Sequence, residues 1–144
     1  MGAIRNRMVV RLPDGELLKG YAHDFFPNRD VFHLKRLDAE GEEIETREIR
    51  LEDVHAIFFV RDFAFERDDH FEEPPEGYVE DASSAGSRKI LVTFTWGERL
   101  EGTTYGYSPS RPGFFVHPTE PVYHAWNIVR VYVRREAVDT VEFP

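Results

Sequence analysis

The feature that most constrains how this chain folds is an internal repeat. Residues 8–36, placed against residues 90–118 at an offset of 82, match at eight of 29 positions, where ordinary residue frequencies give about two by chance. The identical pairs are Val10/Val92, Gly15/Gly97, Glu16/Glu98, Leu18/Leu100, Gly20/Gly102, Pro27/Pro109, Arg29/Arg111 and Phe32/Phe114. A chain of 144 residues that holds one pattern twice is expected to fold as two similar units.

The ends of the two copies align as well, now at an offset of 84. The corresponding pairs are Val54/Val138, Ile57/Val141 and Phe59/Phe143. The second copy has therefore gained two residues, and we place this insertion near residues 118–127.

Each copy has the alternation of apolar and polar residues that is typical of β-strands. We expect strands near residues 8–12, 18–22, 31–35, 44–50 and 55–61, and their counterparts near 90–94, 100–104, 113–117, 127–133 and 138–143. A short turn is expected before each last strand, at residues 51–54 and 134–137. Gly15 and Gly97 suit left-handed hairpin positions, and Gly20 and Gly102 within strands indicate a bulge or a sharp coil that closes a small barrel.

These elements predict an all-β protein of two tandem five-stranded small barrels, related by internal duplication. Five strands with a short turn before the last are the order of SH3-like and Sm-like barrels. We expect the first barrel at residues 1–63, an acidic linker at 64–87, and the second barrel at 88–144.

Acidic charge is concentrated in the predicted linker. Residues 66–81 hold eight acidic residues and one arginine, so they contribute −7 of the formal net charge of −9 and leave −2 for the remaining 128 residues. Like charges, Pro74-Pro75 and a following Ser/Gly run are typical of a solvated linker. The alternative is an acidic arm that docks on a basic partner.

Two resemblances support the barrel interpretation. The pattern Leu12-x-Asp14-Gly15-x-Leu17-Leu18-x-Gly20 resembles the opening of the Sm motif, and Asp24-Phe25-Phe26-Pro27-Asn28 resembles the Asp-x-x-x-Asn loop with which Sm proteins hold a base. That resemblance implies a ligand-binding role for Asp24 and Asn28, whereas the second copy has Gly106 and Ser110 at these positions.

A second resemblance covers both copies. The segments His-Asp-Phe-Phe-Pro at 23–27, Phe-Phe-Val-Arg-Asp-Phe at 58–63 and Tyr-Ser-Pro-Ser-Arg-Pro-Gly-Phe-Phe at 107–115 resemble an uncharacterised bacterial domain family. The resemblance implies association with regulatory and signalling proteins, and it supplies no catalytic residues.

The composition excludes several classes of protein. Hydrophobic residues at 41% provide enough apolar material for a core, and the absence of cysteine excludes disulfide bonds and thiolate chemistry. The longest apolar run, residues 56–60, is far too short to cross a bilayer, and the first eight residues lack the apolar stretch of a secretory signal. We therefore expect a soluble, cytoplasmic protein without a membrane partner.

The residue patterns that catalysis needs are missing. No Gly-x-Ser-x-Gly elbow occurs, and carboxylate pairs occur only in surface runs where nothing desolvates them. The six histidines lack the spacing of a metal site. We therefore expect neither an enzyme nor a cofactor or metal ion.

The sharpest candidate site is the pair Pro27-x-Arg29 and Pro109-x-Arg111, which the repeat places in equivalent loops between the second and third strands. Proline fixes the backbone, and the planar guanidinium can bind a carboxylate or a phosphate. Tyr107 lies beside the second loop. The alternative is structural, with each arginine stacked on neighbouring aromatic rings or paired with the acidic linker.

Phe58 is a candidate interface residue. It aligns with Glu142, while its neighbours Ile57 and Phe59 are expected to face the core, so Phe58 is expected to face outward. An outward phenylalanine in a small barrel is expected to contact either the second barrel or a second subunit.

We therefore expect a non-catalytic binding or regulatory module that recognises a protein or a small anionic ligand through the loops with Arg29 and Arg111. The alternative is an Sm-like protein that binds single-stranded nucleic acid, with bases stacked on Tyr105, Tyr107 and Phe115. Whether the chain forms a homo-oligomer stays open at this level.

Overall fold

The structure is a computed structural model, and it describes residues 6–61, 63, 87–105, 107–119 and 127–144. The predicted linker, residues 64–87, lies outside the described residues except for Ser87, which begins a strand. The predicted boundaries around the linker stay a prediction for this reason.

The described residues form an all-β protein, as the alternation of apolar residues predicts. The first half contains β1 (Asn6–Arg11), β2 (Leu17–Ala22), β3 (Val31–Leu37), β4 (Glu43–Arg50), the 3-10 turn η1 (Leu51–Asp53) and β5 (Ala56–Val60). The second half contains β6 (Ser87–Phe94), β7 (Arg99–Tyr105), β8 (Gly113–Pro118), β9 (Ile128–Arg134), the 3-10 turn η3 (Arg135–Ala137) and β10 (Val138–Glu142). Within the described part of the chain, no helix is long and apolar enough to span a membrane.

The two halves have the same strand order. Hydrogen bonds connect the strands as β5-β1-β2-β3-β4 in the first half and as β10-β6-β7-β8-β9 in the second, and every pairing is antiparallel. The hairpin turns also agree, because Gly15 and Gly97 have φ angles of +89° and +94°. Their N–H groups donate to the carbonyls of Leu12 and Phe94, both at 2.9 Å.

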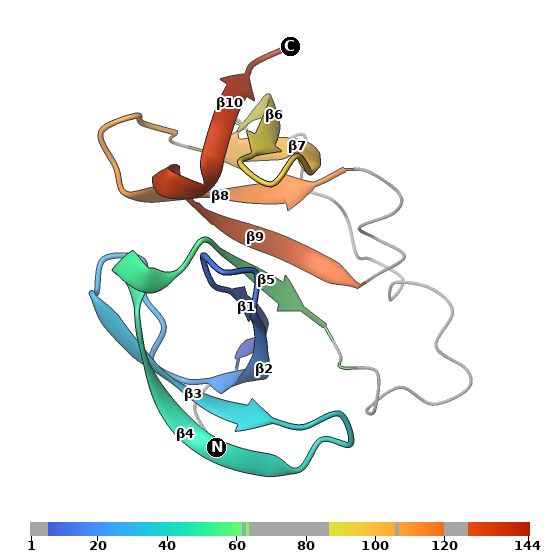
Figure 1. Ribbon diagram of the computed structural model, residues 1–144. Helices are drawn as coiled ribbons and strands as arrows, with labels where there is room; N and C mark the ends of the chain where they lie inside the picture. Colours follow the sequence, from blue (N-terminus) through green and yellow to red (C-terminus); the bar gives the residue numbers. More distant parts are fainter. Residues whose placement is uncertain (1–5, 62, 64–86, 106, 120–126) are drawn as a thin grey trace.

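Gly20 and Gly102 occupy equivalent close approaches between strands. A Cβ atom on Gly20 would overlap the carbonyl of Lys35 in β3, and a Cβ atom on Gly102 would overlap the carbonyl of His117 in β8. Each glycine therefore lets its strand cross the next one closely where the sheet curves (Figure 1).

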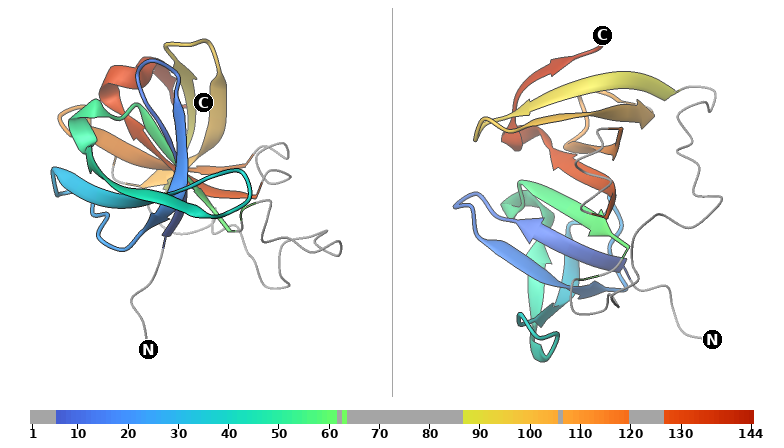
Figure 2. Two further views of the ribbon diagram at one scale, coloured as in Figure 1. Left: turned by 60° about the horizontal axis from the view of Figure 1, so that its bottom comes forward. Right: turned by 90° about the vertical axis from the view of Figure 1, so that its right-hand side faces the viewer.

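The two halves are joined by strand pairing, in contrast to two separate barrels in tandem. β5 of the first half pairs antiparallel with β9 of the second, so all ten strands form one unclosed sheet with β10 and β4 at its edges (Figures 1 and 2). The paired residues are Ala56/Val133, Ile57/Tyr132, Phe58/Val131, Phe59/Arg130 and Val60/Ile128. The physical reason is that an exposed apolar edge strand has backbone groups that need partners.

Side chains of the joining strands alternate between the two cores. Ile57 and Phe59 of β5 belong to the core of the first half, whereas Ala56 and Phe58 pack with the core of the second half. Tyr132 of β9 reaches in the opposite direction and lies in the core of the first half. The junction is therefore a packed apolar interface as well as a hydrogen-bonded ladder.

Candidate functional site

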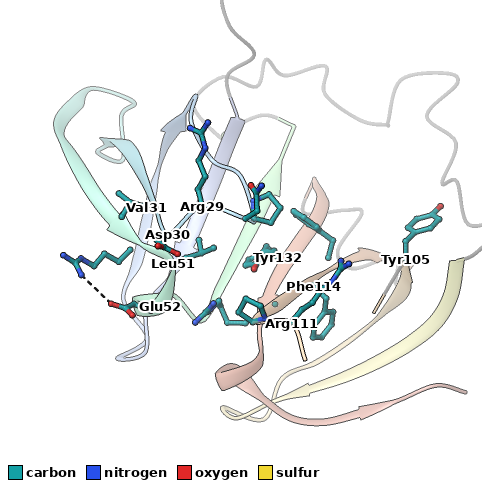
Figure 3. A pocket seen from close by; sticks show the side chains of 16 residues that line it. Arg29, Asp30, Val31, Leu51, Glu52, Tyr105, Arg111, Phe114 and Tyr132 are labelled. Atoms are coloured by element: carbon teal, nitrogen blue, oxygen red, sulfur yellow. Dashed lines mark ion pairs between the residues drawn. The ribbon is translucent and has the colours of Figure 1, made fainter. Parts of the chain in front are cut away.

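Both arginine loops line a single cavity between the two halves. This inter-half cavity has a volume of about 810 Å³. Residues 27–31 and 50–52 of the first half lie on one side of it, and residues of β7, β8, β9 and the loop before β8 lie on the other (Figure 3). The joined halves therefore bring Arg29 and Arg111, 82 positions apart, to one site.

The two loops have the same backbone geometry. The N–H of Arg29 donates to the carbonyl of Phe26 at 3.0 Å, and the N–H of Arg111 donates to the carbonyl of Ser108 at 3.1 Å. The residue after each arginine then accepts a hydrogen bond from the first residue of a 3-10 turn. These contacts are Leu51 N–H to Asp30 at 2.8 Å and Arg135 N–H to Pro112 at 3.0 Å. Each loop is thus fixed to the turn that follows β4 or β9.

The guanidinium groups of these loops are exposed. Arg29 stacks on the ring of Phe26, with 4.7 Å between its Cζ and the ring centroid. This is the stacking on a neighbouring aromatic ring that the structural alternative for Arg29 predicts. Within the described part of the chain, neither Arg29 nor Arg111 forms an ion pair with a carboxylate. Pairing with residues 66–81 falls outside the described residues.

A second pair of equivalent arginines lines the cavity, and sequence reasoning missed it. Arg50 ends β4 and Arg134 ends β9. Each pairs with the acid two positions later, Arg50 with Glu52 at 3.6 Å and Arg134 with Glu136 at 3.3 Å. Both residues of each pair match at the offset of 84, so the repeat alignment, carried across the strand ends, contains the signal for this pair.

Arg134 belongs to the buried part of the site. It is 6% exposed, and its Nε atom is buried without a hydrogen-bond partner in the described part of the chain. Beside it, burial raises the pKa of Tyr132 although the charge of Arg134 opposes that shift, so the phenol stays neutral at neutral pH. A Cβ atom on Gly113 would collide with this phenol, and glycine is therefore required there.

The cavity differs in electrostatic character from the whole chain. Four arginines and two acids, Asp30 and Glu52, line it, which gives +2 by formal charge in a chain of −9. The second half also contributes aromatic side chains, which are Tyr105, Phe114, Phe115 and Tyr132. Clefts that concentrate one sign of charge favour ligands of the opposite sign.

The structure separates Asn28 from Asp24. Asn28 lines the cavity, whereas Asp24 does not. Instead, Asp24 accepts a hydrogen bond from the backbone N–H of His33 at 2.9 Å and contacts the ring Nδ1 of His33 at 2.7 Å. Burial by itself raises the pKa of Asp24, but the bonds from His33 outweigh it and the net shift is downward. The same contact raises the pKa of His33.

The remaining predicted residues lie away from the cavity. Tyr107 packs edge-on against Phe114 and Phe143, with ring centroids 4.9 and 5.2 Å apart. Phe58 lies in β5 opposite Val131 and packs with the core of the second half of the same chain. Among the residues that the structure describes, no three histidine, aspartate or glutamate side chains gather where they could hold a metal ion.

Comparison with known proteins gives a family and no activity. No curated protein and no solved structure matches this chain significantly. The sequence pattern of a family of unknown function, DUF6982, matches residues 4–143. Because that match spans nearly the whole chain, the protein belongs to this family of unknown function.

Proposed function

We propose that the protein is a non-catalytic binding module whose inter-half cavity holds the anionic group of a ligand between Arg29 and Arg111. The observation that carries this proposal is that two equivalent arginines from distant loops line one cavity, each without a carboxylate partner in the described part of the chain. Guanidinium groups bind carboxylates and phosphates through two parallel hydrogen bonds.

The buried side of the cavity supports the same proposal. Arg134 offers an unused Nε–H donor, and the neutral phenol of Tyr132 lies beside it. A buried donor without a partner costs about 1–3 kcal/mol, which an entering acceptor would recover. The ligand is therefore an acidic side chain or terminus of a protein, or a small molecule with an anionic group.

We also propose that each half is a small barrel of the Sm-like or SH3-like kind and that the two arose by duplication. The common strand order, the equivalent 3-10 turns and the matched close approaches at Gly20 and Gly102 support this proposal. The duplication then explains why the two arginine loops have the same hydrogen bonds to their turns.

The test is a titration of the 15N-labelled protein with citrate and, separately, with pyrophosphate, followed by NMR. We expect the side-chain Nε–Hε signals of Arg29, Arg111 and Arg134 to shift with one or both anions. Arg29→Ala and Arg111→Ala should each weaken binding about tenfold, because each removes one charged hydrogen-bonding partner.

Lys35→Ala is the matched control, since Lys35 is an exposed cation on β3 that does not line the cavity. It should leave the affinity unchanged, and all three variants should keep the wild-type melting temperature. The proposal fails if the arginine variants lower the melting temperature and leave anion binding intact.

The rival function is binding of single-stranded nucleic acid. The observation that favours it is Tyr105, which lines the basic cavity and is 40% exposed, so a base could stack on it. Binding to a random oligonucleotide that weakens steeply as salt is added would support the rival. For a single strand, the logarithm of the binding constant falls with the logarithm of the salt concentration with a slope of about 0.7 for each phosphate that the protein neutralises. Weak binding to the oligonucleotide would exclude it.

A further inference from the structure

The two edges of the sheet are equivalent to the two strands that already pair inside the chain. β10 occupies the place in the second half that β5 occupies in the first, and β4 occupies the place of β9. The junction of β5 with β9 is therefore a working example of how one half joins another. β4 and β10 lack a partner at their outer edges among the described residues.

A hollow that could accept a side chain of an added strand lies beside β4. In the second half, Phe58 of β5 lies opposite Val131 of β9 and packs against the core cluster to which Trp96 of the β6–β7 hairpin also packs. In the first half, residues of β4 and of the β1–β2 turn, which correspond to β9 and to that hairpin, line a hollow of about 340 Å³. Leu12, Arg47 and Ile49 are among the residues that line it.

One pair of equivalent positions at the two free edges holds side chains of opposite charge. Inside the chain, Phe58 of β5 lies opposite Val131 of β9. The offset of 84 replaces this apolar pair by Glu142 in β10 and Arg47 in β4. An apolar contact at the inner junction thus corresponds to an acid and a base at the outer edges, and opposite charges across paired strands are favourable.

Two of the three acids of β4, on either side of Arg47, contact side chains of β3. Glu45 forms an ion pair with Arg36, and Glu48 lies 3.9 Å from the ring Nε2 of His33. Arg47 has no ion pair or hydrogen bond through its side chain within the described part of the chain. Neither does Glu142.

We propose that β10 of one copy pairs antiparallel with β4 of a second copy, with Glu142 opposite Arg47. The register of the inner junction also places Thr140 opposite Ile49 and Val141 opposite Glu48. This contact joins different surfaces of the two copies, so repetition leads to a closed ring or an open filament. The proposal concerns self-assembly and does not depend on the function of the inter-half cavity.

The test is the mass of the protein in solution, measured by sedimentation velocity over a series of concentrations from low to high micromolar. We expect the mean mass of the wild type to rise with concentration. Arg47→Glu and Glu142→Arg should each weaken association by about tenfold or more, because each places like charges opposite one another. The double variant, with both changes, should restore association.

Lys35→Glu serves as the control, because it reverses an exposed charge on β3 rather than on the free edge. It should associate as the wild type does, and circular dichroism should show that every variant is folded. A wild type that stays monomeric throughout, or a double variant that associates no better than the single ones, overturns the proposal. The first result would instead assign a protective role to the edge charges.

Discussion

At the scale of single residues, the contact between Asp24 and His33 holds the beginning of the first arginine loop. The carboxylate receives both the backbone N–H and the ring Nδ1 of His33, so one side chain fixes the loop to the start of β3. The Sm-like resemblance implies that Asp24 binds a ligand, and the structure assigns this carboxylate an intramolecular partner instead. Asp24 therefore affects the cavity only indirectly, by fixing the position of the loop that contains Arg29.

The contact has a defined pH range. The pKa of His33 is raised in the folded protein, so its contribution to stability is complete below the unfolded pKa of about 6.5 and is lost as the pH rises through the folded value. The pKa of Asp24 is lowered, so its contribution is complete above the unfolded pKa of 3.8 and is lost as the pH falls through the folded value. The contact is strongest where Asp24 is charged and His33 is protonated.

A double-mutant cycle with Asp24→Asn and His33→Gln tests this range. The coupling energy between the two residues should be larger at about pH 5.5 than at about pH 8.5, because His33 loses its charge between these values. Urea unfolding of the four proteins at each pH gives the coupling energy, and NMR titration should show a lower pKa for His33 in Asp24→Asn. Equal coupling at both pH values would contradict the charge-based account.

At the scale of elements, the close approaches at Gly20 and Gly102 set the curvature of each half. We expect Gly20→Ala and Gly102→Ala each to lower the free energy of unfolding by about 3 kcal/mol, because the added Cβ overlaps a carbonyl of the next strand. Gly97→Ala is the matched control. A Cβ atom at position 97 would meet open space, and the only strain would come from the left-handed φ of this residue. Gly97→Ala should therefore lower the free energy of unfolding by about 1–2 kcal/mol. Urea unfolding measures all three, and equal costs would contradict the overlap.

The strands and turns follow from local pattern, and the joining of the halves does not. Alternation predicts the strands because each one has a buried face, and the turn glycines mark positions with positive φ. Pairing between β5 and β9 depends on two edges far apart in the chain, and periodicity within each strand does not contain that information. Phe58 indicated part of this pairing. Its expected outward position required an apolar partner but did not say whether that partner was the second half or a second subunit.

The same reasoning explains which site residues were predicted. Arg29 and Arg111 were found because they match between the copies within an unbroken alignment. Arg50 and Arg134 were missed because they lie beyond the two inserted residues, where the first offset no longer holds. That both arginine loops line one cavity is a property of the assembled sheet, and neither copy contains it alone.

At the scale of the whole molecule, the packing of Phe58 against the second half links the stability of the two halves. We expect Phe58→Glu to lower the free energy of unfolding by about 3 kcal/mol, because it removes apolar contacts and brings a charge to the apolar junction. Ile44→Glu is the matched control, since Ile44 is 55% exposed on the free edge of β4, and it should change stability by less than about 0.5 kcal/mol. Chemical denaturation compares them, and similar effects would contradict a packed junction.

The covalent connection between the halves has a further consequence for the β5–β9 junction. Two strands on one chain meet at an effective concentration of roughly millimolar, whatever the dilution of the protein. The inner junction therefore forms equally well in a cell that makes few copies and in one that makes many. The proposed outer contact between β10 and β4 of different copies would depend on abundance, so gene dosage would control assembly and leave the shape of the individual molecule, with its cavity, unchanged.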